Sequence, residues 1–141
     1  MRGNPLIKTI LGARIRWYQP NGWVFNPVIL LPDTIDYTVQ VGPHAGRHAI
    51  HHIHYHRITQ GVELTSWYEE TGAVVNIVWY LESQTSHRFA ALPKWAADEI
   101  ESIAGDNQDE SFLARVREAA RKGPDGPRRI FSDDGYFELI D

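Results

Sequence analysis

Six of the seven histidines lie within sixteen residues, in the stretch GPHAGRHAIHHIHYHR at positions 42–57. Side chains alternate between the two faces of a β-strand, so four of these histidines would share one face, with His51 and Tyr55 on the other. The four are His48, His52, His54 and His56. Two or three imidazoles at this spacing can ligate zinc or iron, and Glu69 or His87 could supply a further ligand. The alternative is a row of partly exposed polar side chains, so the run admits a metal site without requiring one.

The same stretch contains an arginine, Arg47, directly after an Ala-Gly pair. A guanidinium that faces a mostly apolar interior is costly unless it is paired with a carboxylate or a ligand anion. Its planar fork suits a carboxylate substrate in particular. The alternative is a surface arginine at the start of a strand. Arg47 is therefore a candidate for substrate binding if it faces inward.

The elements that must position these residues are strands in the first two thirds of the chain. Alternating or β-rich runs predict the strands, and turn signals such as Asn21-Gly22 and Pro32-Asp33 separate them. The predicted strands are 14–19, 23–31, 34–41, 47–58, 62–69, 74–82 and 86–92. Many short strands at regular spacing are typical of a closed antiparallel barrel, and a small barrel can hold one small ligand.

The pattern then changes to that of two short helices. Apolar residues recur with helical spacing over 95–104. A second helix fits 110–122, where Asp109 can cap the start and Gly123-Pro124 marks the end. We expect these helices to form an insertion near the C-terminus of the barrel.

The last segment, 128–140, is predicted to form a hairpin around Asp134-Gly135, a dipeptide typical of two-residue turns. The 141 residues contain no repeat or linker and are enough for one hydrophobic core. We therefore expect a single domain over 1–141, mainly β, with two short helices near the C-terminus.

The composition argues against several classes of protein. The chain has no cysteine, which excludes disulfides and thiolate chemistry and fits a cytoplasmic protein. Its net charge is −4 and its basic residues are scattered, so we expect no nucleic-acid partner. The first 17 residues hold no apolar run long enough for a signal segment or a membrane span, so we expect no membrane partner. Five tryptophans are enough to line an apolar cavity.

Several fragments along the chain, in order and at matching spacing, resemble the bacterial phenolic acid decarboxylases. They are LG at 11–12, NGW at 21–23, TIDY at 34–37, GR at 46–47, SWYEETG at 66–72, PKW at 93–95, DNQ at 106–108 and RE at 117–118. The resemblance implies a closed, lipocalin-like β-barrel, a homodimer, and an active site inside the barrel. It also implies that CO2 is removed from a 4-hydroxycinnamic acid without a metal or an organic cofactor.

The resemblance also assigns the catalytic pair. The family arginine falls on Arg47 and the family glutamate on Glu69, with Glu70 as the candidate if the register slips by one residue. A glutamate buried against an apolar wall is expected to have a raised pKa and to act as a general acid. Arg47 would neutralise the substrate carboxylate or hold Glu69 in place. The alternative is a buried ion pair that only closes the barrel.

The amphipathic pattern and the family register disagree about the strand at 62–69. Amphipathicity alone would turn Val62 and Leu64 inward and Glu69 outward. The family register turns Trp67 and Glu69 inward, which requires a barrel whose outer face is also partly apolar. We expect the family register.

The chain departs from the family on its first strand. Two family tyrosines that hold the polar end of the substrate align with Trp17 and Gln19, which offer one indole N–H and one amide instead. Trp23, Tyr37 and Trp67 are expected to complete the substrate-binding wall. The altered lining predicts a changed substrate.

Three hypotheses follow. The first is a cofactor-independent lyase that acts on a small unsaturated or phenolic carboxylic acid, with Arg47 and Glu69 as the catalytic pair. The second is a lipocalin-like binding protein or a non-decarboxylating isomerase or cyclase, motivated by the missing tyrosines. The third is a His-ligated metalloenzyme. Whether His48 or His52 reaches the cavity and replaces the lost hydrogen bonds is left open by the sequence.

Overall fold

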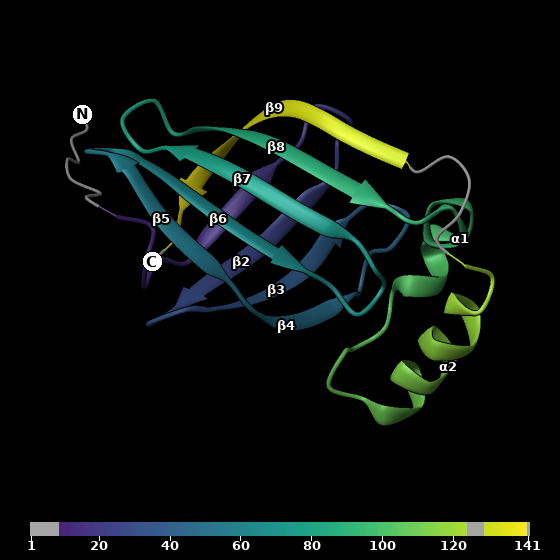
Figure 1. Cartoon of the computed structure of the whole chain (residues 1–141). Helices are drawn as coiled ribbons and strands as arrows, with labels where there is room; N and C mark the ends of the chain where they lie inside the picture. Colours follow the sequence, from purple (N-terminus) through teal and green to yellow (C-terminus); the bar gives the residue numbers. More distant parts are fainter. Residues whose placement is uncertain (1–8, 124–128, 141) are drawn as a thin grey trace.

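Nine strands form one antiparallel sheet that curls into a nearly closed barrel in the computed structural model, which describes residues 9–123 and 129–140 (Figure 1). Expectations that concern residues 1–8, Pro124 and residue 128 lie outside the described residues. The strand order is β4-β3-β2-β1-β9-β8-β7-β6-β5. The strands are β1 (Ile15–Tyr18), β2 (Val24–Leu30), β3 (Thr34–Val41), β4 (His48–His52), β5 (His54–Thr59), β6 (Val62–Tyr68), β7 (Val74–Tyr80), β8 (Thr85–Leu92) and β9 (Arg129–Leu139).

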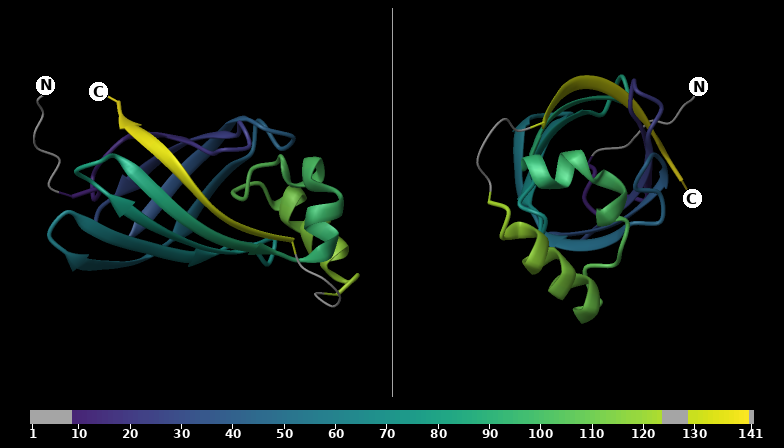
Figure 2. Two further views of the ribbon diagram at one scale, coloured as in Figure 1. Left: turned by 90° about the horizontal axis from the view of Figure 1, so that it is seen from above. Right: turned by 90° about the vertical axis from the view of Figure 1, so that its right-hand side faces the viewer.

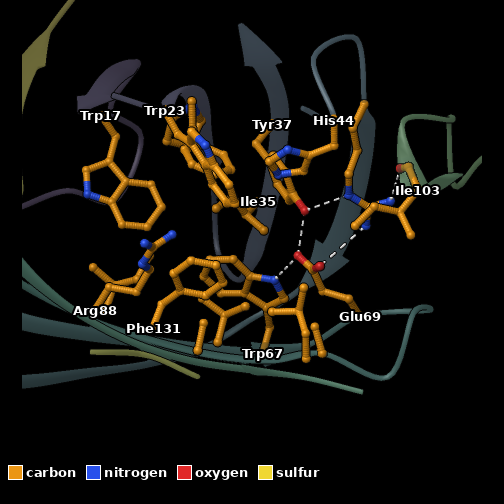
Figure 3. A pocket seen from close by; sticks show the side chains of 18 of the residues that line it. Trp17, Trp23, Ile35, Tyr37, His44, Trp67, Glu69, Arg88, Ile103 and Phe131 are labelled. Atoms are coloured by element: carbon orange, nitrogen blue, oxygen red, sulfur yellow. Dashed lines mark hydrogen bonds and ion pairs between the residues drawn. The ribbon is translucent and has the colours of Figure 1, made fainter. Parts of the chain in front are cut away.

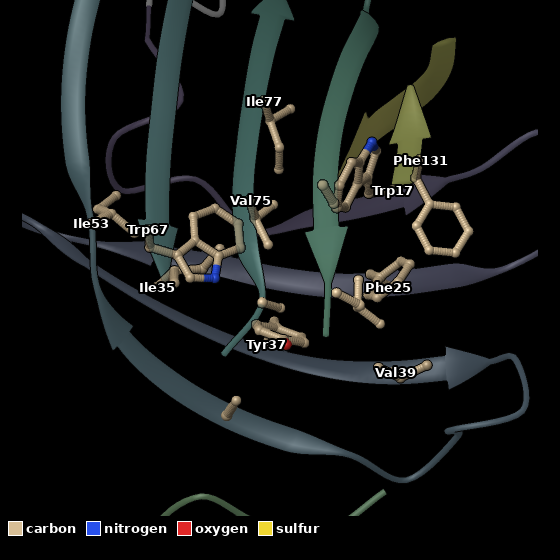
Figure 4. Packing of buried hydrophobic residues seen from close by; sticks show 14 of the residues in the cluster. Trp17, Phe25, Ile35, Tyr37, Val39, Ile53, Trp67, Val75, Ile77 and Phe131 are labelled. Carbon is tan, nitrogen blue, oxygen red and sulfur yellow. The ribbon is translucent and has the colours of Figure 1, made fainter. Parts of the chain in front are cut away.

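Alternation along the strands divides the barrel into an inner and an outer face. In β3, for example, Ile35, Tyr37 and Val39 are buried, whereas the residues between them are not. Aromatic rings pack the inner face, with Trp79 between Trp17 and Phe137 at centroid distances of 5.4 and 5.1 Å. Figure 4 shows inward side chains, among them Trp17, Tyr37 and Trp67, converging from strands around the barrel. The core therefore lies inside the barrel.

The helices lie at one end of the barrel (Figure 2). The helix predicted over 95–104 is broken into α1 (Lys94–Asp98) and the 3₁₀ turn η1 (Ile100–Ile103), because Glu99 leaves helical geometry with φ −126° and ψ 54°. The second helix, α2 (Glu110–Ala120), is confirmed, with Asp109 accepting a hydrogen bond from the Ser111 backbone N–H. Among the described residues no helix has the length and apolarity needed to span a membrane.

The predicted strand at 47–58 is divided at Ile53 into β4 and β5. These two strands are consecutive in the chain but form opposite edges of the sheet. Ile53 is buried, and its backbone N–H donates to the carbonyl of Asp33 at 2.7 Å. The barrel is therefore closed at this point by the chain itself.

The hairpin predicted at the C-terminal end is wrong. Residues 129–139 form one continuous strand, β9, which pairs with β8 on one side and β1 on the other. Gly135 lies in the middle of β9, where a Cβ atom would collide with the backbone carbonyl oxygen of Tyr18. The glycine therefore permits a close approach of β1 rather than a turn.

Candidate active site

A cavity lies inside the barrel, toward the end that the helices cover (Figure 3). The space within its lining amounts to about 660 Å³, a figure that includes open solvent. Aromatic and aliphatic side chains make up most of its wall. The polar and charged residues that line it are Tyr37, His44, Arg47, Glu69 and Arg88.

Arg47 forms the centre of a buried polar cluster at the helix end of the cavity. The side chain is 1% exposed and follows a tight turn in which Gly46 has φ +94°. Its Nε donates to the Tyr37 hydroxyl at 3.0 Å, and Nη1 donates to Glu70 at 2.7 Å and to the Ile103 carbonyl at 3.1 Å. Nη2 donates to Glu70 at 3.1 Å and to Glu69 at 3.4 Å. Every donor of the guanidinium therefore has a partner.

Glu69 faces the cavity, as the family register predicts. It follows β6 and begins a turn in which its backbone N–H donates to the Ala73 carbonyl at 2.8 Å. Oε2 accepts a hydrogen bond from the Tyr37 hydroxyl at 2.6 Å and another from the Trp67 indole at 2.9 Å. Val62, in contrast, lies on the outer face of β6. Arg47, Glu69, Tyr37 and Trp67 are thus brought together, and Glu70, the alternative candidate, joins the same cluster.

The protonation state of Glu69 differs from the sequence expectation. Burial by itself would raise the pKa of Glu69, but the charges of Arg47 and His51 and the hydrogen bonds from Tyr37 and Trp67 lower that pKa below its usual value. Burial and the charge of Glu69 raise the pKa of Tyr37 well above its usual value. Glu69 is therefore a carboxylate and Tyr37 a neutral phenol, so the predicted resting general acid with a raised pKa is wrong.

Two histidines face inward that the sequence analysis did not assign to the site. His51 Nε2 lies 3.7 Å from a Glu69 oxygen and 3.6 Å from a Glu70 oxygen, and it has no hydrogen-bond partner among the described residues. His44 lines the cavity beside Trp23, with ring centroids 4.8 Å apart. Burial lowers the pKa of His51, and it lowers that of His44 to about 4. Strand alternation sets His51 apart from the other histidines and places it on the same face as Arg47. This alternation is the sequence signal that could have assigned His51 to the site.

The other histidines do not reach the cavity. His48 lies on the outer face and contacts Asp36 and Asp106, with N···O distances of 2.7 and 2.9 Å. His52 and His87 are also on the outer face, where His87 contacts an aspartate of β9. None of them is therefore placed to bind a ligand inside the cavity. Within 9–123 and 129–140, no group of three or more histidine or acidic side chains is arranged to hold a metal ion.

The first-strand residues lie at the inner end of the cavity, away from the Arg47 cluster. Trp17 lines the cavity, and its indole donates to the Ser86 hydroxyl at 2.8 Å. Gln19 is buried on the same face of the chain but does not line the cavity. Trp23 lines the cavity and packs against Phe131 at 5.2 Å. Of the two candidate residues Trp17 and Gln19, Trp17 alone lines the cavity among the described residues.

A second inward-facing arginine occupies this inner end. Arg88 is 4% exposed and lines the cavity, and it donates from Nε and Nη2 to the two carboxylate oxygens of Asp133 at 3.0 and 2.6 Å. Its guanidinium carbon lies 4.6 Å from the ring centroid of Phe131 and 5.8 Å from that of Trp17. Arg88 was not predicted from the sequence. Strand β8 has Phe89 facing outward and Ala90 facing inward, so neither of its faces is clearly polar or apolar in the sequence.

Comparisons with known proteins identify relatives of the chain. A family model described as "Phenolic acid decarboxylase (PAD)" matches residues 7–139. A "Probable phenolic acid decarboxylase" of Vibrio cholerae is 30% identical over 131 residues, which cover 92% of this chain and 73% of that protein. The phenolic acid decarboxylase PadC of Bacillus subtilis is 28% identical over 114 residues, which cover 79% of this chain and 71% of that protein.

A solved structure has a similar fold. It is described as a "putative beta-lactamase" from Burkholderia vietnamiensis, and it superposes with a TM-score of 0.62 over 99% of this chain and 100% of that chain. The sequence identity is 13%, so this likeness concerns the fold alone.

Proposed function

The chain belongs to the phenolic acid decarboxylase family, and from this premise we propose that it is a cofactor-independent carboxy-lyase. Its substrate is a small unsaturated or phenolic carboxylic acid bound inside the barrel. The observation that carries the proposal is the Arg47–Glu69–Tyr37 cluster, which lies at the wall of a cavity that is otherwise mostly apolar. Such a site combines groups that can move a proton with walls that exclude water.

The reaction requires one proton on the alkene carbon next to the carboxylate, followed by cleavage of the bond to CO2. The charge of Arg47 helps to hold Glu69 ionised. A substrate carboxylate beside Arg47 competes with Glu69 for the guanidinium, which raises the pKa of Glu69 and lets it take up a proton. Glu69 then donates this proton to the alkene carbon, and the electrons of the broken C–C bond complete the new double bond as CO2 leaves.

Tyr37 and Trp67 act as positioning residues for this step. Both donate to the same oxygen of Glu69, at 2.6 and 2.9 Å, so the other oxygen is left to Arg47 and to the incoming substrate. Tyr37 also accepts a hydrogen bond from Arg47, so its hydroxyl links the two catalytic groups. The orientation of the carboxylate is thereby set by two rigid aromatic side chains.

The test is turnover of coumarate and ferulate, followed by CO2 release and by loss of the substrate. We expect Glu69→Gln to lower kcat by about 10²–10⁴-fold, the range for loss of a positioned proton donor. Glu82→Gln, at an exposed turn, is the matched control and is expected to retain full activity. An unchanged rate in Glu69→Gln would rule out the assigned role.

One observation favours a second function, that of a lipocalin-like binding protein. All the donors of Arg47 have partners within the protein, so the cluster can also serve only to close the barrel. This alternative predicts that the wild-type protein retains an aromatic acid and releases no CO2. Decarboxylation of any cinnamic acid by the wild-type protein contradicts it.

We further propose a cytoplasmic homodimer. Strands β6 to β9 carry exposed apolar side chains on their outer face, including Tyr68 at 76%, Ile130 at 57% and Phe89 at 41% exposure. Tyr68 pairs with Val74, Val74 pairs with Ala91 of β8, and Ala91 pairs with Ile130. These side chains therefore form a continuous band across the four strands. Light scattering during size-exclusion chromatography measures the oligomeric state. Phe89→Glu is expected to shift the protein from dimer to monomer.

A further inference from the structure

We propose that Arg88 is a specificity-determining residue that binds a hydrogen-bond-accepting oxygen at the inner end of the substrate. The inference deepens the proposed function and rests on it, because it assumes that the substrate lies in the same cavity with its reacting end at Glu69. Figure 3 shows Arg88 and Trp17 at one end of the cavity, and Tyr37 and Glu69 at the other. A molecule that spans the cavity therefore meets a charged group at each end.

The hydrogen bonds of Arg88 leave part of its guanidinium available to a ligand. Asp133 engages Nε and Nη2, and Nη1 forms no hydrogen bond with any described residue. Phe131 lies against the guanidinium at 4.6 Å and restricts its orientation. Arg47 differs, since all its donors are used within the protein. Of the two arginines, Arg88 is the one that can accept a new partner without losing an old one.

The charges at the two ends also favour an oxygen acceptor beside Arg88. At the helix end the guanidinium of Arg47 is paired with two carboxylates, those of Glu69 and Glu70. At the inner end Arg88 is paired with Asp133 alone. An electron-rich oxygen such as a ring hydroxyl or phenolate meets less negative charge there, and it can accept from a donor-only guanidinium.

The ligand chemistry follows from these neighbours. The wall between the two ends is aromatic and aliphatic, which suits a flat ring. The carboxylate end is proposed to face Arg47 and Glu69, so the group beside Arg88 is an oxygen substituent on the far side of the ring. Arg88 then binds the end of the ring that lies opposite the carboxylate.

The experiment compares two saturated acids that differ by one ring hydroxyl, 3-phenylpropanoate and 3-(4-hydroxyphenyl)propanoate. Neither has the alkene, so neither can be decarboxylated, and titration calorimetry gives each dissociation constant. We expect the wild-type protein to bind the hydroxylated acid about 10-fold more tightly, as for one hydrogen bond to a charged group. We expect Arg88→Met to bind both acids equally, with the affinity for 3-phenylpropanoate unchanged.

Two further variants keep the result decisive. Arg88→Met/Asp133→Asn removes the pair without leaving a lone buried carboxylate, and it should also lose the preference. Arg121→Met, on an exposed helix end, is the matched control and should keep the preference. Equal affinities in the wild-type protein, including no binding of either acid, would overturn the proposal, as would a preference that survives in both Arg88 variants.

Turnover of 4-hydroxycinnamate is measured separately on the same proteins. A preference for the hydroxylated acid that depends on Arg88, without turnover, supports the subsite and contradicts the proposed lyase. Turnover without any such preference supports the lyase and overturns the subsite. The two failures are therefore distinguishable.

Discussion

The two arginines that face the cavity are almost equally buried, yet they are held in different ways. Arg47 has two carboxylates, a phenol and a backbone carbonyl around it, and none of its donors is free. Arg88 has one carboxylate and two aromatic neighbours. A buried charge must be paired in either case. The number of internal partners, rather than the burial, separates a cluster that the protein completes by itself from one that a ligand can complete.

The largest difference between the two ends is expected in stability. Arg47→Met leaves the buried carboxylate of Glu69 and the half-buried carboxylate of Glu70 without this cation, and we expect it to lower the free energy of unfolding by about 3–5 kcal/mol. Arg88→Met leaves one carboxylate, that of Asp133, which is 19% exposed and can be hydrated, so we expect a loss of about 1–3 kcal/mol. Urea unfolding midpoints measured at equal slope check both values. Equal losses would show that the two ends are held alike.

The next effect concerns His44, whose pKa is influenced by both arginines. Burial, followed by the charge of Arg47, lowers its pKa to about 4 from the usual 6.5. Between these values the unfolded chain binds the proton and the folded protein does not, so stability falls as the pH falls, by up to about 1.4 kcal/mol per unit. Over the whole range between the two pKa values, the free energy of unfolding falls by about 3 kcal/mol. We expect His44→Leu to flatten the dependence of urea midpoints on pH between 6.5 and 4, and an unchanged slope would contradict it.

The smallest effect isolates the hydrogen bond between Tyr37 and Glu69. Tyr37→Phe removes a donor from a buried carboxylate, and we expect a loss of about 1.5–2 kcal/mol at neutral pH. The pKa of Glu69 is lowered in the folded protein, so its contribution is present above its unfolded pKa and is lost as the pH falls through the folded one. Without the Tyr37 hydroxyl this loss should begin at higher pH. Carboxylate titration of Glu69 by NMR measures the shift, with Tyr80→Phe on the outer face as the control.

Much of the fold could be predicted because strand alternation is a local property. The runs at 34–41 and 62–69 correspond to β3 and β6, and Asp109 caps α2 as its spacing indicates. The errors concern residues whose role depends on contacts with segments far away in the sequence. Gly135 accommodates the Tyr18 carbonyl of a strand more than a hundred residues earlier, and no local signal separates this role from that of a turn.

Residues that face the cavity were predicted where they stand in a sequence motif. They were missed where only the packing of the barrel places them there. Arg47 and Glu69 stand in matched fragments, and both face the cavity. Amphipathicity pointed Glu69 the wrong way, because Tyr68 and Val74 leave the outer face apolar as well. The pKa of Glu69 was predicted in the wrong direction, since burial was apparent from the sequence and the four groups that oppose it were not.

The division between β4 and β5 at Ile53 bears on how the chain could be circularly permuted. Because β4 and β5 are the two edges of the sheet, a chain that began at β5 would pass through β6, β7, β8 and β9 and then β1 to β4, each strand beside its predecessor. Two described residues near the ends of the chain are adjacent, since the Ile140 N–H donates to the Arg14 carbonyl at 2.9 Å. A circular permutant opened at Ile53 would thus be a plain nine-strand meander in which every ladder is retained.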